Sequence, residues 1–257
     1  MALEQIDRAK IRVQDLSFFY GSKQALKNND LEIAEKRVNA LIGPSGCGKS
    51  THIRTYNRMF SLYPGQRATG RVLLDEIDVL DPNAIDGFEL RSRVGMVLQR
   101  PTPFPMSIWD NVAFGLKLAG LDRTAIERRV VQALQQSGLW DDVKNRLKTP
   151  AASLSTVQQQ TMCIARALAV EPEVLLLDEP CGYLDPGAAD RIEELVLSMR
   201  GDVTVVLVTH NVQQAARVSD YTAVFFSGEV VEHAPTDVLF TRPSEQRTED
   251  YITGKFG

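Results

Sequence analysis

The stretch GPSGCGKS, residues 43–50, decides how this chain folds. It directly follows the apolar strand pattern VNALI and directly precedes the helical pattern STHIRTYNRMF. Its glycines let the backbone curl so that several N–H groups face one anion, and the start of the helix adds its dipole. Lys49 is placed to reach terminal phosphates, and Ser50 to ligate magnesium. A plain glycine-rich turn is the alternative, but the strand and helix context favours a P-loop.

A second signal is VLLLDEP, residues 174–180, an apolar strand pattern that ends in two adjacent acids. Asp178 is placed to hold the ligand shell of a magnesium ion. Glu179 is placed to orient or deprotonate an attacking water. Alone, such an acid pair is more often a solvated turn or a helix cap. Together with the P-loop it favours a site that hydrolyses a nucleotide.

Two polar residues follow other predicted strands. Gln99 comes after VGMVL, and His210 comes after VTVVLVT. Ligand sites of open parallel sheets lie at the carboxyl ends of the strands. Both residues therefore fit a hydrolase site, although either one alone is more often an ordinary polar residue.

Short apolar strand patterns alternate with helical periods along the chain, which predicts an α/β fold with a mostly parallel core sheet. The predicted core strands are VNALIG, VGMVLQ, EVLLLD, TVVLVTH and TAVFF. The earlier patterns IRVQDLSFFY and GRVLLDEIDVL alternate more strongly and predict an N-terminal antiparallel β-subdomain.

Between Gln99 and Arg166 only helical patterns occur, among them SIWDNVAFGLKLAG and a helix capped by Asp122. We therefore expect a helical subdomain inserted at residues 99–165, after the Pro-rich entry RPTPFPM. The nucleotide-binding core, with its antiparallel β-subdomain, would comprise residues 1–98 and 166–257, and the whole chain 1–257 would be a single domain.

Composition narrows the class of protein. The 257 residues are 44% hydrophobic with a net charge of −4 and no run of Lys or Arg, as in a globular chain that does not bind nucleic acid. The N-terminus lacks an apolar signal region, and no apolar run approaches the roughly 18 residues of a membrane span. We therefore expect a cytosolic chain. Its three cysteines are widely separated, so we interpret them as reduced thiols.

Several motifs occur in one fixed order over residues 11–252: GPSGCGKST, a Gln after a strand, LS..Q before a helix, LLLDEP, LD and VTH. In this order they resemble the ATPase subunit of an ABC transporter. The stretches RTYNRM, GMVLQRPTPFPMSIWDNVAFG and TEDYITGKFG resemble, more narrowly, the bacterial phosphate-import subfamily. The resemblance implies an ABC-type nucleotide-binding domain that forms a homodimer around two ATP molecules. Its partners would be two membrane permease subunits and an extracytoplasmic phosphate-binding protein, at the cytoplasmic face of the inner membrane.

The resemblance also implies roles for single residues, with ATP and Mg²⁺ as ligands. ATP would be bound by Tyr20, stacked on adenine, and by the loop residues Gly43, Pro44, Ser45, Gly46, Cys47, Gly48, Lys49, Ser50 and Thr51. Catalysis would use Glu179, His210 and Gln99, and magnesium would be held by Ser50, Gln99 and Asp178. The opposite subunit's nucleotide would meet Ser155 and Gln158, and Asp185 would lie in the loop that crosses the dimer.

Alternatives remain for some of these roles. Phe18 or Phe19 could replace Tyr20, and Asp185 could simply cap the helix that starts at Pro186. The segment RPTPFPMSIWDN would face the permease, although Trp109 could equally lie in a buried loop of the helical insertion.

The chain departs from the family pattern in LSTVQQQ, residues 154–160. Ser155 is the expected N-cap of the following helix, but Thr156 and Val157 stand where the family has two glycines. Thr161 occurs where an Arg usually follows. His52 replaces an apolar residue, and CGYLDP replaces a run of small residues before Asp185.

Three classes of function remain. The favoured one is a magnesium-dependent ATPase that energises phosphate import. The second is a nucleotide-binding switch or regulatory subunit with weak hydrolysis, because the signature loop is altered; an importer subunit for another small solute is a variant of the first. The third, an ABC ATPase acting on nucleic acid, is disfavoured by the acidic charge.

Overall fold

The computed structural model describes residues 6–255. The beginning of MALEQIDRAK (residues 1–5) and the end of TEDYITGKFG (residues 256 and 257) lie outside the described residues. The chain forms two compact units. The first contains the residues up to Arg91 and those from Met199 onward, and the second is Ser92–Ser198.

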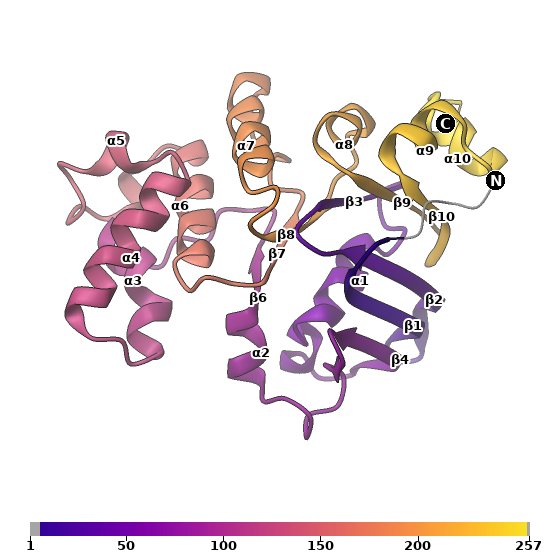
Figure 1. Ribbon diagram of the computed structural model, residues 1–257, viewed down its shortest axis with the longest axis horizontal. Coiled ribbons are helices and arrows are strands. Elements are labelled where there is room, and N and C mark those ends of the chain that lie inside the picture. Colours follow the sequence, from indigo (N-terminus) through magenta and orange to yellow (C-terminus); the bar gives the residue numbers. More distant parts are fainter. Residues whose placement is uncertain (1–5, 256–257) are drawn as a thin grey trace. The chain divides into compact units, whose positions relative to one another are not determined.

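The first unit holds an antiparallel sheet with the strand order β2-β1-β4-β5 (Figure 1). Its strands are β1 (Ala9–Tyr20), β2 (Lys23–Ala34), β4 (Gln66–Leu74) and β5 (Ile77–Asp78). The two antiparallel strand regions predicted from the sequence are thereby confirmed. Strand β2 was not predicted. Its buried Leu31 and Ile33 alternate with exposed Asp30 and Glu32, which is the signal that could have revealed it.

The first unit also contains the strands β3 (Val38–Ile42), β8 (Thr204–Val208), β9 (Tyr221–Phe226) and β10 (Glu229–Pro235). Strand β3 pairs in parallel with β8 and with β9, while β10 is antiparallel to β9. All residues of β3 and β8 are buried, which explains their unbroken apolar sequences. The remaining elements of this unit are α1 (Lys49–Tyr56), η1 (Met59–Leu62), α8 (Val212–Val218), α9 (Thr236–Thr241) and α10 (Gln246–Ile252). Helix α2 (Gly87–Arg93) includes the boundary residue Arg91.

In the second unit, β6 (Val94–Val97) and β7 (Val174–Asp178) pair in parallel. Its helices are α3 (Ile108–Leu118), α4 (Arg123–Gln136), α5 (Trp140–Val143), η2 (Ala151–Ser153), α6 (Thr156–Leu168) and α7 (Pro186–Ser198). Figure 1 shows α3, α4 and α6 gathered in one helical group. The predicted cap is confirmed, since the Asp122 side chain accepts a hydrogen bond from Ala125 N at the start of α4.

These elements confirm the predicted fold class: an α/β protein with an N-terminal antiparallel sheet, mostly parallel core strands, and helices. Residues 99–165, all of them described, contain helices and a single isolated bridge between Ser107 and Pro150. The subdomain bounds 1–98, 99–165 and 166–257 stay a prediction. Within residues 6–255, every helix is too short or too polar to cross a lipid bilayer.

Candidate functional site

The P-loop backbone has a shape that only glycine allows at two positions. Gly43 has φ +143°, and a Cβ atom there would lie 2.2 Å from the carbonyl oxygen of Phe225. Gly48 has φ +113°, and its Cβ would lie 2.7 Å from Leu26 Cδ2. Because side-chain-bearing residues rarely adopt these angles, both glycines are needed for the curl of the loop between β3 and α1.

Lys49 is folded back into this loop. Its Nζ donates hydrogen bonds to the carbonyl oxygens of Gly43 at 2.7 Å and Pro44 at 2.9 Å, and lies 3.6 Å from Cys47 Sγ. The side chain is almost fully buried, with 4% of its surface exposed. Burial raises the pKa of the Cys47 thiol, and the neighbouring Lys49 partly opposes this rise. The loop thus holds a cation on carbonyl oxygens, a position in which phosphate oxygens could replace them.

Among the three aromatic residues FFY, Tyr20 is the one that faces solvent at the end of β1. The residue is 39% exposed, whereas Phe18 is 1% exposed and belongs to the core. Phe19 carries the guanidinium of Arg67 over its ring, 3.8 Å from the centroid. Tyr20 Oη lies 2.9 Å from Thr51 Oγ1, so a hydrogen bond ties the exposed ring to the start of α1. Stacking on adenine stays a prediction for this residue.

His52 packs as an aromatic core residue. It is fully buried, its Nδ1 is 3.0 Å from the hydroxyl of Tyr56, and its ring meets Phe225 edge-on at 5.1 Å. Its Nε2 finds no hydrogen-bond partner among the described residues. Burial lowers the pKa of His52 to about 3, so the ring is neutral. The replacement of an apolar residue at this position is therefore accommodated by packing.

In the second unit, the structure brings Gln99 and Glu179 together. Gln99 lies two residues after the end of β6, and Glu179 directly follows β7 with a left-handed φ of +48°. Gln99 Nε2 donates to Glu179 Oε2 at 2.9 Å. Asp178, the last residue of β7, is buried. The side-chain bond between the end of β6 and the end of β7 places an amide beside the proposed water-orienting carboxylate.

Sequence reasoning missed Gly182 in this arrangement. A Cβ atom on Gly182 would lie 2.8 Å from Gln99 Nε2 and 3.3 Å from the carbonyl oxygen of Glu179. The glycine therefore leaves the space that the Gln99 side chain occupies. Its signal was present in the sequence, as the one glycine within the unusual CGYLDP stretch.

Asp185 and His210 lie in loops after strands. Asp185 Oδ1 accepts a hydrogen bond from Ala188 N at 3.0 Å, so this residue does cap the start of α7, as the simpler interpretation proposed. The role of Asp185 in a loop that crosses the dimer interface stays a prediction. His210, in the first unit, is exposed and lies two residues beyond the end of β8.

The prediction for LSTVQQQ is confirmed in its structural part, because Ser155 caps α6. Its side chain accepts from Gln158 N, and Gln158 Oε1 accepts from Ser155 N at 3.3 Å, which completes a capping box. Gln158 Nε2 also donates to Asp142 Oδ2 at 3.1 Å, and Arg146 donates to Gln158 Oε1 at 3.4 Å. Asp142 and Arg146 were not singled out from the sequence, where nothing local marks them. Contacts of Ser155 and Gln158 with an opposite subunit stay a prediction.

Asn111 organises the segment RPTPFPMSIWDN. Its buried amide accepts from Phe104 N and donates to the carbonyl oxygens of Phe104, Met106 and Ser107. Phe104 packs on Phe114, with ring centroids 4.8 Å apart. Trp109 is half-buried and lines a cavity of about 750 Å³. The segment is thus a loop held by hydrogen bonds to Asn111, leading into α3, with partly exposed aromatic residues.

Comparison with known proteins agrees with this geometry. The sequence model of the family described as ABC transporter matches residues 26–182, more than half of the chain. CbiO1 of Clostridium perfringens, described as part of the ABC transporter complex cbiONQ, is 28% identical with a TM-score of 0.79, and the match covers 97% of both chains.

A bacterial Atm1-family ABC exporter with ATP bound is 24% identical with a TM-score of 0.80, which shows a shared fold. That match covers 99% of this chain and 43% of the exporter chain. The family match spans the P-loop, the Ser155 cap and the Asp178–Glu179 pair. The chain belongs to the ABC transporter family, in which it is an ATP-binding domain.

Proposed function

We propose that this chain hydrolyses ATP to energise the import of inorganic phosphate through a membrane ABC permease. The single observation that carries the ATPase part is the buried Lys49, whose ammonium rests on carbonyl oxygens inside a glycine-shaped loop. The phosphate part is supported by sequence resemblance in PTPFPMSI and TEDYITG.

The first unit would bind the nucleotide. Lys49 exchanges its carbonyl acceptors for phosphate oxygens, and the first N–H groups of α1 face the same anion. The hydroxyl groups of Ser50 and Thr51 complete the phosphate contacts. Tyr20 offers its exposed ring to adenine while its hydroxyl stays on Thr51. His210 contacts the terminal phosphate in this proposal.

The second unit would supply the hydrolytic groups. Glu179 orients and deprotonates the attacking water, and Gln99 holds the Glu179 carboxylate through its amide. The amide oxygen of Gln99 has no hydrogen-bond partner in the described part of the chain, which suits a metal ligand or a water acceptor. Ser50, Gln99 and Asp178 offer the oxygen atoms that Mg²⁺ prefers, and the ion would neutralise phosphate charge.

The proposed partners are those that the family resemblance implies. The ATP-bound form would be a homodimer in which Ser155, Gln158 and Asp185 of each copy face the other. The segment around Phe104 and Trp109 would meet one of two permease subunits. The chain would be peripheral at the cytoplasmic face of the membrane, with a phosphate-binding protein outside. CbiO1 is itself described as part of a multi-subunit complex, which supports assembly but leaves another small solute as an alternative cargo.

A second candidate function is a nucleotide-dependent switch with weak hydrolysis. It is favoured by Thr156 and Val157, whose side chains replace hydrogen atoms at the start of α6. In this function the chain would bind ATP normally and turn it over slowly.

The test uses the purified chain and Lys49→Ala. We expect ATP affinity to fall by about tenfold to a hundredfold, because a charge-assisted contact to the phosphates is lost. The exposed Lys255→Ala serves as the matched control and should bind ATP as the parent does. Unchanged affinity in Lys49→Ala would refute the assignment. For the cargo, uptake of labelled phosphate is measured in cells that carry the chain together with the permease subunits of a phosphate importer. Uptake that is unaffected by Lys49→Ala would refute phosphate import.

A further inference from the structure

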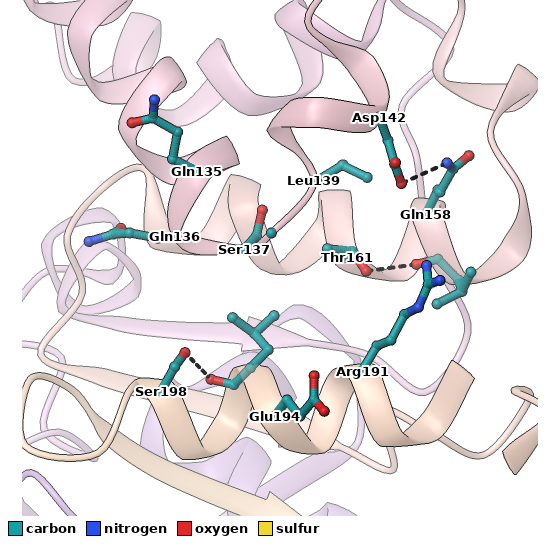
Figure 2. Close-up of a pocket in the computed structure, with 13 residues that line it drawn as sticks. Gln135, Gln136, Ser137, Leu139, Asp142, Gln158, Thr161, Arg191, Glu194 and Ser198 are labelled. Atoms are coloured by element: carbon teal, nitrogen blue, oxygen red, sulfur yellow. Dashed lines mark hydrogen bonds between the residues drawn. The ribbon is translucent and has the colours of Figure 1, made fainter. Parts of the chain in front are cut away.

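A cavity of about 430 Å³ opens on the surface of the second unit, away from the residues assigned above to hydrolysis. Its walls come from the end of α4, from α5, from the first turns of α6, and from α7 (Figure 2). This volume is at the small end of the range typical of ligand pockets, which is roughly 300 to 1,000 Å³. The cavity therefore suits a small molecule.

The α7 wall carries two unpaired charges. Arg191 and Glu194 lie one helical turn apart, both exposed, and neither has an ion-pair or hydrogen-bond partner among the described residues. Figure 2 shows Arg191 extending from α7 toward the start of α6. The other charged lining residue, Asp142, is already bonded to Gln158 Nε2. The cavity thus offers one free cation and one free anion on the same wall.

The rest of the lining is apolar or neutral. Leu139 and Leu195 are buried and contribute carbon surface, together with the half-buried Val157. Thr161 directs its hydroxyl to the carbonyl oxygen of Val157 at 2.9 Å, so its donor is already used. The neutral polar side chains include Gln135, Gln136 and Ser198. A ligand would therefore find a small aliphatic area and neutral polar groups beside the two opposite charges.

We propose that this cavity binds a free α-amino acid with an aliphatic side chain. The carboxylate pairs with the guanidinium of Arg191, whose planar fork matches a carboxylate. The ammonium pairs with Glu194, and the side chain packs against Val157 and the two leucines. A simple anion would leave Glu194 as a repelling neighbour, and a simple amine would be repelled by Arg191, so the charge pattern selects a zwitterion.

The location gives this site a consequence for α6. Val157, Gln158 and Thr161 all lie in its first two turns, so a bound amino acid would contact the segment in which Thr156 and Val157 depart from the family pattern. The binding itself requires no nucleotide and goes beyond the proposed ATPase function.

The experiment titrates L-leucine into the full chain without nucleotide, by calorimetry. Two matched probes lack one charge each: 4-methylpentanoate has no ammonium, and 3-methylbutylamine has no carboxylate. We expect saturable binding of leucine and binding weaker by about tenfold or more for either probe, because each loses a charge-assisted contact. Arg191→Gln and Glu194→Gln should weaken leucine binding by a similar factor.

Three further variants complete the design. Thr161→Arg places a long cationic side chain in the cavity and should abolish leucine binding. Arg128→Gln and Asp190→Asn remove exposed charges that do not line the cavity and should bind leucine as the parent does. Thermal unfolding confirms that each variant is folded.

Several results would overturn the proposal. These are the absence of leucine binding by the parent, equal binding of 4-methylpentanoate, or undiminished binding by folded Thr161→Arg. Because no ATP is present, none of these results bears on hydrolysis, so failure here is distinguishable from failure of the proposed function.

Discussion

At the scale of single residues, Gly182 sets how close Gln99 can lie to Glu179. A methyl group at position 182 would meet the Gln99 amide at 2.8 Å, and this amide is the end of a flexible side chain. The backbone of Gly182 is not left-handed, so alanine fits its conformation. We therefore expect Gly182→Ala to displace Gln99 while leaving the fold intact.

The predicted result for Gly182→Ala is a kcat lower by about tenfold to a hundredfold, since misplacing a catalytic contact by an ångström has such effects. Thermal unfolding should change little. Gly187→Ala is the matched control, because its Cβ would meet only Asp185 Oδ1 at an ordinary 3.6 Å. Equal kcat values for the two variants would contradict a role for the Gln99–Glu179 contact.

The buried His52 makes the stability of the first unit depend on pH. Its pKa is about 3 in the folded chain and 6.5 in the unfolded chain, so the unfolded chain binds the proton more readily. Its contribution is complete above the unfolded pKa and is lost progressively as the pH falls from 6.5 toward 3. At pH 5 this loss amounts to about 2 kcal/mol.

Denaturant unfolding of the parent and of His52→Leu checks this expectation. The free energy of unfolding of the parent should fall more steeply between pH 8 and pH 5 than that of the variant. His233, whose pKa burial lowers to about 4, is retained in both proteins, so the difference in slope isolates His52. Parallel pH profiles would show that His52 does not titrate as a buried group.

At the scale of elements, the start of α6 combines a normal cap with unusual first-turn residues. Thr156 is exposed, while Val157 is half-buried and lines the cavity described above. In the proposed ATP-bound dimer, Thr156 is therefore the side chain that obstructs close approach of a phosphate to the backbone. The side chain of Val157 packs against its own subunit and should obstruct the approach of a phosphate less.

We expect Thr156→Gly, alone or with Val157→Gly, to raise kcat well above that of the parent. Val157→Gly alone should change it little. Each glycine should cost about 1 kcal/mol of stability at the helix start, and the affinity for ATP should stay similar. Steady-state ATPase assays and unfolding curves measure both effects. A parent that already hydrolyses ATP rapidly, with no gain from Thr156→Gly, would rule out the steric obstruction.

Elements with a clear local sequence signal, such as a capping residue before a helical period, could be predicted from the sequence. Polar strands at the edge of a sheet could not. The caps Asp122 and Ser155 were predicted because a short acceptor side chain preceded a clear helical period. The strand β10, half-buried over most of its length, was missed because its sequence EVVEHAP has neither an unbroken apolar run nor a clear alternation. Its position depends on pairing with β9, which is information held in the fold.

At the scale of the whole molecule, the predicted site residues divide between the two compact units. Tyr20, Lys49 and His210 belong to the first, and Gln99 and Glu179 to the second. The positions of Gln99, Glu179 and His210 just after strands could be predicted, because ligand sites of parallel sheets lie at the carboxyl ends of the strands. The bond between Gln99 and Glu179 could not, because it joins side chains that are 80 residues apart in sequence. The Gln158–Asp142 bond escaped prediction because its partners lie on different helices, 16 residues apart in sequence. Gly182 is visible in the sequence as the glycine of CGYLDP, but the space that it leaves for Gln99 depends on the fold.

The last prediction concerns assembly. Glu179→Gln keeps an oxygen that can accept from Gln99 Nε2, so the local geometry should survive, while the carboxylate that deprotonates water is lost. This variant should bind ATP, fail to hydrolyse it, and elute as a dimer in size-exclusion chromatography with ATP and magnesium. Glu127→Gln, on the surface of α4, is the matched control and should hydrolyse ATP as the parent does. Elution of Glu179→Gln as a monomer at saturating ATP would mean that two copies of this chain do not close around the nucleotide. The pairing surface formed by Ser155 and Asp185 would then have to meet a different partner.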